Sequence, residues 1–166
     1  ANLTKALKSP NIRGSWGQIH LRRVVELAGL ANHCDFFEQA SVSDGEKTYR
    51  PDLIIKLPGE RQIIIDAKTP IDAYLQAAES TDLRVKEQKR KEHANGIKKH
   101  MQLLSNKEYW TQFPVTPEYV ILFLPAEAFF SAALQEEPTL LEIGAKKNII
   151  IATPTTLIAI LKAIAF

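Results

Sequence analysis

Two apolar segments joined by a tight turn constrain the fold of this chain more than any other feature. Residues 49–57 and 62–68 are rich in β-branched side chains, and Pro58, Gly59 and Glu60 lie between them. Segments of this kind form strands, and a short turn of this composition joins them as a hairpin. The uninterrupted isoleucines at 63–65 are typical of a strand covered on both faces. A central sheet with helices around it is therefore predicted.

The rest of the pattern places helices between the later strands. Hairpin-linked strands early in the chain, followed by strands separated by helices, predict an α/β domain with a mixed β-sheet flanked by helices. The predicted helices cover residues 15–28, 70–78, 80–104, 126–135, 140–146 and 154–166, and the other predicted strands cover residues 36–42, 119–124 and 149–152.

The composition is that of one ordinary folded domain. The 166 residues are 45% hydrophobic and 24% charged, which excludes a disordered chain and makes a second full domain unexpected. No run of about 18 apolar residues occurs, so no membrane contact by this domain is expected. The single cysteine, Cys34, cannot form an internal disulfide, and this favours a reducing, cytoplasmic location.

Charged residues interrupt both strands of the hairpin at the same end. Asp52 opens the first strand, and Asp66 and Lys68 close the second. Residues two apart in a strand share a face, and the start of one antiparallel strand lies near the end of its partner. We therefore expect two carboxylates and one ammonium to converge at one rim of the sheet, with the carboxylates within roughly 6 Å of each other.

This combination suits metal-assisted hydrolysis of a phosphate ester. Mg²⁺ is often held by one or two carboxylates together with substrate phosphates, and a bound cation lowers the pKa of its water. Asp52 and Asp66 are the predicted ligands, and Lys68 is predicted to orient the attacking water. The alternative is that Asp66 and Lys68 form an ion pair at a strand end and that Asp52 caps a turn.

Pro51–Asp52 followed by Asp66–Ala67–Lys68 resembles the PD-(D/E)xK signature of restriction-endonuclease-like nucleases. Longer stretches are similar to the DNA recombination protein RmuC family, and this resemblance extends from about residue 13 to the C-terminus. Those stretches are residues 14–17, 26–30, 50–52, 65–68, 107–110 and 154–157.

The resemblance implies a restriction-endonuclease-like core over residues 13–166 and DNA as the substrate class. It implies Mg²⁺ as the metal, with Mn²⁺ as a possible replacement. Family members carry a long N-terminal coiled coil, so homo-oligomers formed through such a segment are implied as well. Residues 1–12 would then be the end of an upstream helix or a linker.

The resemblance is broken at position 18. Nucleases of this class often carry a Glu on the first helix that joins the metal site, and the family's Trp-Gly-Glu pattern would place it there. Gln18 stands at that position in this chain. Its amide supplies a carbonyl oxygen without a charge, so it is a catalytic candidate with weaker metal binding. The alternative is that Gln18 completes a capping box with Ser15.

A basic segment runs from Arg84 to Lys107, although the formal net charge of the whole chain is only +2. Clustered cations can bind phosphate even on a domain that is nearly neutral. The alternative is a solvated helix face. The predicted DNA contacts are Arg50, Lys89, Arg90, His93, Lys98 and Lys99.

Three functions therefore stay open. The first is a divalent-metal-dependent deoxyribonuclease that hydrolyses phosphodiester bonds. The second is a catalytically degenerate DNA-binding module, which the glutamine at position 18 favours. The third is an interaction domain on a coiled-coil scaffold, without a role in nucleic-acid binding.

Overall fold

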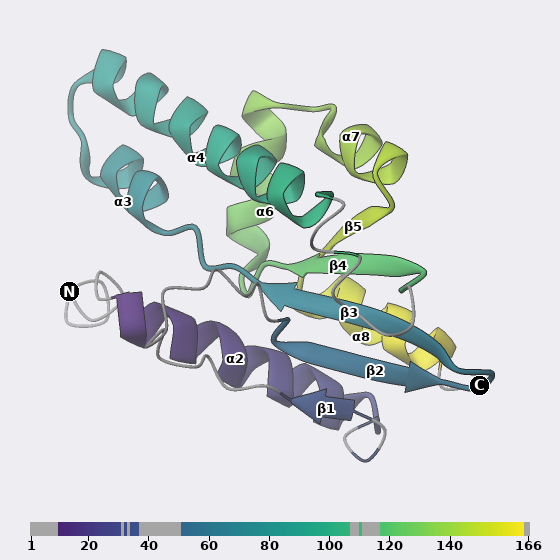
Figure 1. The fold of residues 1–166 in the computed structure, drawn as a ribbon. Coiled ribbons are helices and arrows are strands. Elements are labelled where there is room, and N and C mark those ends of the chain that lie inside the picture. Colours follow the sequence, from purple (N-terminus) through teal and green to yellow (C-terminus); the bar gives the residue numbers. More distant parts are fainter. Residues whose placement is uncertain are drawn as a thin grey trace, which may run out of the picture.

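A five-stranded mixed sheet forms the centre of the computed structural model (Figure 1). The structure describes residues 10–30, 32, 34–36, 51–106, 110 and 117–164. The strands follow one another in the sheet in the same order as in the sequence. They are β1 (Cys34–Phe36), β2 (Leu53–Leu57), β3 (Arg61–Ala67), β4 (Tyr119–Phe123) and β5 (Ile149–Ala152).

The predicted hairpin is confirmed. β2 pairs antiparallel with β3, and Leu53 lies opposite Ile65. The turn between them takes two residues into the left-handed region, with φ of 79° at Gly59 and 62° at Glu60. Glycine adopts such angles without steric cost, which explains its place in this turn. β1 adds antiparallel to β2, whereas β3, β4 and β5 are mutually parallel, so the sheet is mixed as predicted.

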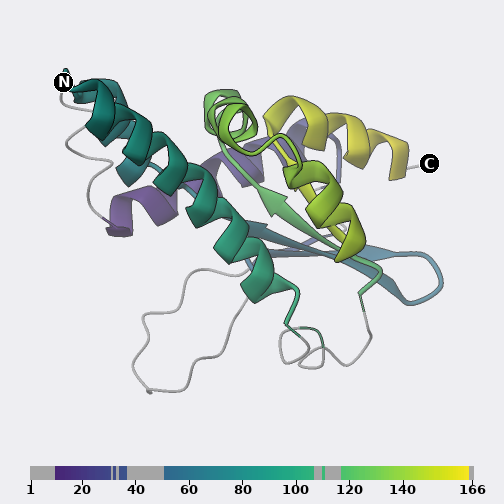
Figure 2. The same cartoon turned by 90° about the horizontal axis from the view of Figure 1, so that it is seen from above.

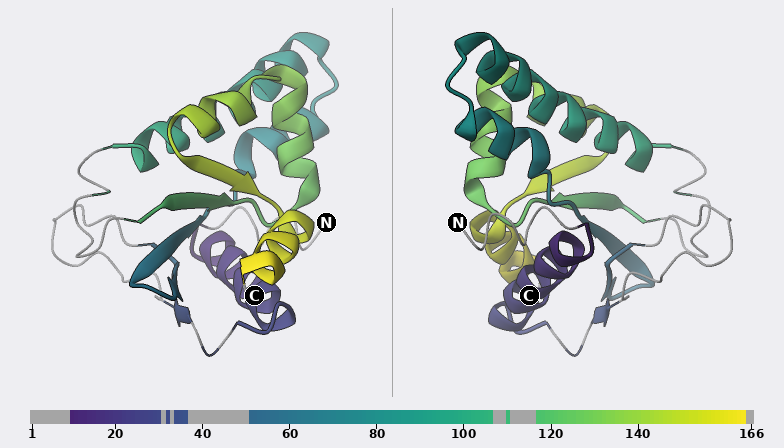
Figure 3. Two further views of the ribbon diagram at one scale, coloured as in Figure 1. Left: turned by 90° about the vertical axis from the view of Figure 1, so that its right-hand side faces the viewer. Right: turned by 90° about the vertical axis from the view of Figure 1, so that its left-hand side faces the viewer.

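Helices cover both faces of the sheet. α2 (Pro10–Leu27) and α8 (Pro154–Ile164) lie on one face, and the other described helices lie on the opposite face (Figures 1 and 3). Seen from above, α4 is the long helix of the second layer, with α6 beside it (Figure 2). The helices of this layer are α3 (Asp72–Glu79), α4 (Leu83–Leu104), α6 (Glu127–Glu136) and α7 (Leu140–Lys146).

The sheet separates two apolar cores, and β3 contributes to both. Ile63 and Ile65 pack toward α2 and α8, whereas Ile64 packs toward α4, α6 and α7. This alternation follows from the two-residue period of a strand, and it explains why three consecutive isoleucines are all buried. β3 is therefore fixed from both sides, and so are the polar residues at its end.

The first described helix begins earlier than predicted. A helix is predicted from residue 15, after Pro10 and Gly14, but α2 begins at Pro10 and continues through Gly14 and Gly17. Proline is well tolerated in the first turn of a helix because its missing N–H would be unpaired there in any case. Ser15 therefore lies inside the helix, so it cannot be the N-cap of a capping box with Gln18.

α2 ends at Leu27, one residue before the predicted helix end at residue 28, and Gly29 stops it. Gly29 has a φ of 77°, its N–H donates to Glu26, and the N–H of Leu30 donates to Val25. These are the two bonds of a Schellman motif, in which the left-handed residue is usually glycine.

Some predictions lie outside the described residues. They include the predicted strand after Phe36, the predicted phosphate contact Arg50, and residues 1–9 of the predicted upstream segment. Within the described part of the chain, no helix combines the length and apolar character needed to cross a membrane.

Candidate functional site

Asp52 lies directly before β2 and is held against the end of β3. Its N–H donates to the carbonyl of Ile65 at 3.0 Å, and its carboxylate Oδ2 accepts from the N–H of Ala67 at 2.7 Å. The side chain thus continues the bonding between the two strands beyond their last backbone pair. Only 7% of Asp52 is exposed, so this carboxylate is a buried group at a sheet end.

Gln18 reaches Asp52 from α2. Its Nε2 donates to Oδ1 of Asp52 at 2.9 Å. The neighbouring residue makes this approach possible, because a Cβ added at Gly17 would lie 2.9 Å from Oγ1 of Thr69, just beyond β3. A glycine in this position lets the helix backbone pass close to the strand end. The structure therefore brings Gln18 to the predicted carboxylate.

Asp66 is contacted from the opposite layer. Its Oδ1 lies 3.1 Å from Nε2 of His100 on α4, and the two side chains are 14% and 20% exposed. We did not predict His100 as a site residue. Its distance of seven residues from His93 indicated only that both lie on one helix face, and this spacing carries no information about a contact with β3.

The charge of Asp66 acts on Asp52. The pKa of Asp52 is raised from 3.8 to about 6, first because burial disfavours the charged form and second because Asp66 is negative. The hydrogen bonds from Gln18 and Ala67, and the nearby His100, act in the opposite direction. The end of the β2–β3 hairpin therefore holds two carboxylates that are largely shielded from water.

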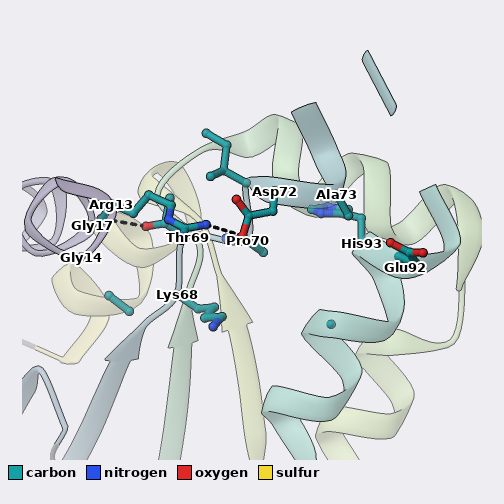
Figure 4. A pocket seen from close by; sticks show the side chains of 13 residues that line it. Arg13, Gly14, Gly17, Lys68, Thr69, Pro70, Asp72, Ala73, Glu92 and His93 are labelled. Carbon is teal, nitrogen blue, oxygen red and sulfur yellow. Dashed lines mark hydrogen bonds and ion pairs between the residues drawn. The ribbon is translucent and has the colours of Figure 1, made fainter. Parts of the chain in front are cut away.

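Lys68 follows β3 directly and borders an open cavity. Its N–H donates to the carbonyl of Phe123 at 2.9 Å, and its side chain is exposed. The cavity has a volume of about 390 Å³ and lies between α2, the β3–α3 connection and α4 (Figure 4). Arg13 closes one side by pairing with Asp72 at 2.5 Å. A ligand in this cavity would meet the ammonium of Lys68.

The donor set at the sheet end fits a hard divalent cation. Asp52 and Asp66 are close enough for the charge of Asp66 to raise the pKa of Asp52, whereas Gln18 presents its amide nitrogen to Asp52, so its oxygen would reach a cation there only after the amide turned. Mg²⁺ commonly takes only one or two protein carboxylates and completes its shell with water and phosphate oxygens. Among the described residues, no group of three or more His, Cys, Asp or Glu side chains is placed to hold a metal.

The predicted basic contacts lie along α4 but differ in their surroundings. Lys89 pairs with Glu92 at 3.0 Å, so part of its charge is already neutralised. Arg90 and Lys99 are exposed and Lys98 is half-buried, and none of the three is in an ion pair within the described ranges.

His93 does not fit the role of a phosphate contact that we predicted. Only 3% of the residue is exposed, and its Nε2 lies 2.8 Å from the carbonyl of Phe129. Because a carbonyl only accepts, His93 donates this bond and ties α4 to α6. We therefore leave His93 out of the proposed DNA-contacting set.

The fold and the site define an α/β domain with a carboxylate pair and an adjacent lysine at one end of a mixed sheet. The sequence profile of the RmuC family matches residues 1–166. The chain therefore belongs to the RmuC family. No solved structure matches the chain significantly.

Several curated relatives resemble the chain over almost its whole length. A DNA recombination protein RmuC homolog of Chlamydia pneumoniae is 45% identical over 99% of this chain and 38% of its own length. The homolog of Zymomonas mobilis is 40% identical over 98% of this chain and 37% of its length. DNA recombination protein RmuC of Escherichia coli K12 is 37% identical over 99% of this chain and 35% of its length. The chain thus spans little more than a third of these relatives.

Proposed function

We propose that this domain acts on DNA in recombination as a divalent-metal-dependent nuclease of the PD-(D/E)xK type. The single observation that carries the proposal is the pair formed by Asp52 and Asp66. Burial and mutual repulsion raise the pKa of Asp52 to about 6, which is the electrostatic situation that a bound cation would relieve. The names of the relatives support DNA recombination as the setting.

Each residue has a distinct role in the proposed reaction. Asp52 and Asp66 would hold Mg²⁺ or Mn²⁺, Gln18 would fix the orientation of Asp52, and His100 that of Asp66. The cation would supply neutralisation of the phosphodiester and a more acidic water. Lys68 stands two residues after Asp66, exposed at the cavity, where its ammonium can orient the attacking water or hold a phosphate oxygen. DNA is the proposed partner of the basic side of α4, which is formed by Arg90, Lys98 and Lys99.

The test is cleavage of single-stranded, duplex and branched DNA in the presence of Mg²⁺, Mn²⁺ or EDTA. Asp66→Ala should abolish metal binding and cleavage together. Lys68→Ala should lower the rate and leave metal and DNA binding largely intact, because its role is realised in the transition state. Glu142→Gln on α7 removes an exposed carboxylate far from the site and is the matched control. A wild-type chain that cleaves no better with metal than with EDTA would refute the proposal.

A DNA-binding module without nuclease activity is the second candidate. Both oxygens of Asp52 already accept hydrogen bonds from the protein, and a glutamine stands where an acidic ligand is expected. Such a module would bind DNA equally well with Mg²⁺ and with EDTA, and Asp66→Ala would not weaken that binding.

A further inference from the structure

A second cavity lies between α3, α4 and α6, apart from the acidic pair. Its volume is about 280 Å³, close to the lower limit for small-molecule sites. α3 contributes Tyr74 and two alanines, α4 contributes Lys86, Arg90 and His93, and α6 contributes Ala132 and Gln135. Neither Asp52 nor Asp66 lines it, and none of its described lining residues is a carboxylate.

The charge of this cavity comes from two cations on one helix face. Lys86 and Arg90 are four residues apart on α4, a spacing that places them on one helix face and at which like charges repel. Neither side chain is in an ion pair within the described part of the chain, although Lys89 and Lys91 of the same helix both pair with glutamates. An anion between Lys86 and Arg90 would therefore neutralise both.

The rest of the lining suits a flat, partly apolar group. Ala77, Ala78 and Ala132 provide a smooth apolar surface, and Tyr74 packs its ring against His93 and Phe129. Gln135 adds one amide, which can both donate and accept a hydrogen bond. A nucleobase needs this combination of an apolar surface and a few polar partners.

We propose that the cavity between α3, α4 and α6 binds a nucleotide through its phosphate and base. Lys86 and Arg90 would hold the phosphate, whose charge as a monoester of about −1.5 to −2 matches two cations. Tyr74 and the alanines would face the base, and Gln135 would bond to its edge. The ligand is either a free nucleotide or the phosphorylated end of a DNA strand. This site does not depend on DNA cleavage by the acidic pair.

Titration calorimetry of the chain with 2′-deoxyadenosine 5′-monophosphate, in EDTA, tests the proposal. We expect saturable binding to the wild type that K86A/R90A weakens at least tenfold. K146A/K162A removes the same charge from exposed positions on α7 and α8 and should change the dissociation constant by less than twofold. A132W, which fills the cavity without changing its charge, should weaken binding as strongly as K86A/R90A. Circular dichroism identifies any variant that fails to fold.

Further ligands measure the separate contributions of the phosphate and the base. They also distinguish a free nucleotide from the phosphorylated end of a DNA strand. Deoxyadenosine and inorganic phosphate should each bind at least tenfold more weakly than the nucleotide. An oligonucleotide with a 5′-phosphate that binds more tightly than its 5′-hydroxyl form, and loses this preference in K86A/R90A, identifies a strand end. Equal binding of the two oligonucleotides, with the mononucleotide still bound, identifies a free nucleotide. The proposal is overturned if the wild type does not bind the mononucleotide, or if K86A/R90A and K146A/K162A weaken its binding equally. It is also overturned if inorganic phosphate binds as tightly as the mononucleotide.

Discussion

Asp52 is a carboxylate whose protonation state is coupled to the folding of the chain. Folding removes it from water and places it near Asp66, so the folded protein binds its proton more tightly than the unfolded chain does. The free energy of unfolding should therefore fall as the pH rises from about 4 to about 6, because the unfolded state releases this proton first. The difference between a pKa of 3.8 and one of about 6 corresponds to roughly 3 kcal/mol.

Asp52→Asn should remove this pH dependence and raise the stability of the metal-free protein at neutral pH. An asparagine has no charge, its Oδ1 can accept from Ala67, and its Nδ2 can donate to Gln18 once that amide has turned. Urea unfolding at several pH values between about 4 and 7 measures the effect. Parallel pH profiles for the wild type and the variant would show that Asp52 ionises normally in the folded protein.

Gln18→Glu should make the stability of the chain depend on metal. Without a divalent cation, the new carboxylate would face Asp52 at the place where Gln18 now donates a hydrogen bond, and we expect a loss of about 1–3 kcal/mol at pH 7. Mg²⁺ should restore that stability and bind more tightly than to the wild type. Unfolding with and without Mg²⁺ measures both effects. Gln88→Glu, on the exposed side of α4, is the control. It should neither lower the stability without metal nor tighten the binding of Mg²⁺.

The sequence predicted part of this site because part of it is local. Asp52, Asp66 and Lys68 belong to one hairpin, so alternation and antiparallel pairing were enough to place them at one end of the sheet. The contact of Asp66 with His100 spans 34 residues and depends on how α4 lies on the sheet. The contact of Gln18 with Asp52 also spans 34 residues, and only the family resemblance pointed to it.

At the level of helices and strands, two glycines inside helices have opposite structural roles. A Cβ added at Gly144 of α7 would lie 2.6 Å from the carbonyl oxygen of Ile149, which is backbone and cannot easily move. A Cβ added at Gly96 of α4 would meet nothing within 4 Å. Gly144 is therefore required for the close packing of α7 on β5, whereas no neighbouring atom requires a glycine at position 96, which borders the cavity beside Lys68.

Substitution of each glycine by alanine tests this distinction. Gly144→Ala should destabilise the domain by about 1–3 kcal/mol, as overpacking of a tight contact does. Gly96→Ala should stabilise it by about 0.5–1 kcal/mol, because alanine favours a helix interior. Equilibrium unfolding in urea measures both changes. A destabilising Gly96→Ala would mean that α4 needs flexibility at its centre.

The basic side of α4 can be tested through the salt dependence of DNA binding. Lys98 and Lys99 are not neutralised by ion pairs within the described residues, and each phosphate contact contributes about one unit to the slope of log affinity against log salt. The double variant Lys98→Ala/Lys99→Ala should weaken binding at low salt and reduce that slope by about 2. Lys89→Ala should change the affinity at low salt and the slope less than the double variant does, because Glu92 already pairs with Lys89. An unchanged slope in the double variant would assign these lysines to a solvated helix face.

Whole elements were predictable where a local signal marked both of their ends. β5 and α7 occupy the predicted residues, and α8 begins at Pro154 as predicted. The start of α2 was not predictable in this way, because Pro10 and Gly14 suggest a break on local grounds. In the folded chain, Leu21, Val24 and Val25 anchor α2 on the sheet, and tertiary packing of this kind outweighs weak helix propensity.

On the scale of the whole molecule, the candidate site lies where the two helical layers meet the end of β3. α2 supplies Gln18 from one face of the sheet, and α4 supplies His100 from the other. The apolar core on each face of the sheet holds the helices of that face in position. A ligand at this end therefore contacts groups whose positions depend on the complete fold, so its binding free energy should add to global stability.

Mg²⁺ should consequently raise the melting temperature of the whole chain. A ligand that binds only the folded state at 100 times its dissociation constant adds about 2.7 kcal/mol, which corresponds to roughly 5–10 °C for a domain of this size. Asp66→Asn and Asp52→Asn should abolish the increase, and Glu142→Gln should retain it, because only the first two remove a proposed ligand. Scanning calorimetry with Mg²⁺, with Mn²⁺ and with EDTA measures the effect independently of any cleavage. An equal increase in all four proteins would place the metal elsewhere on the domain.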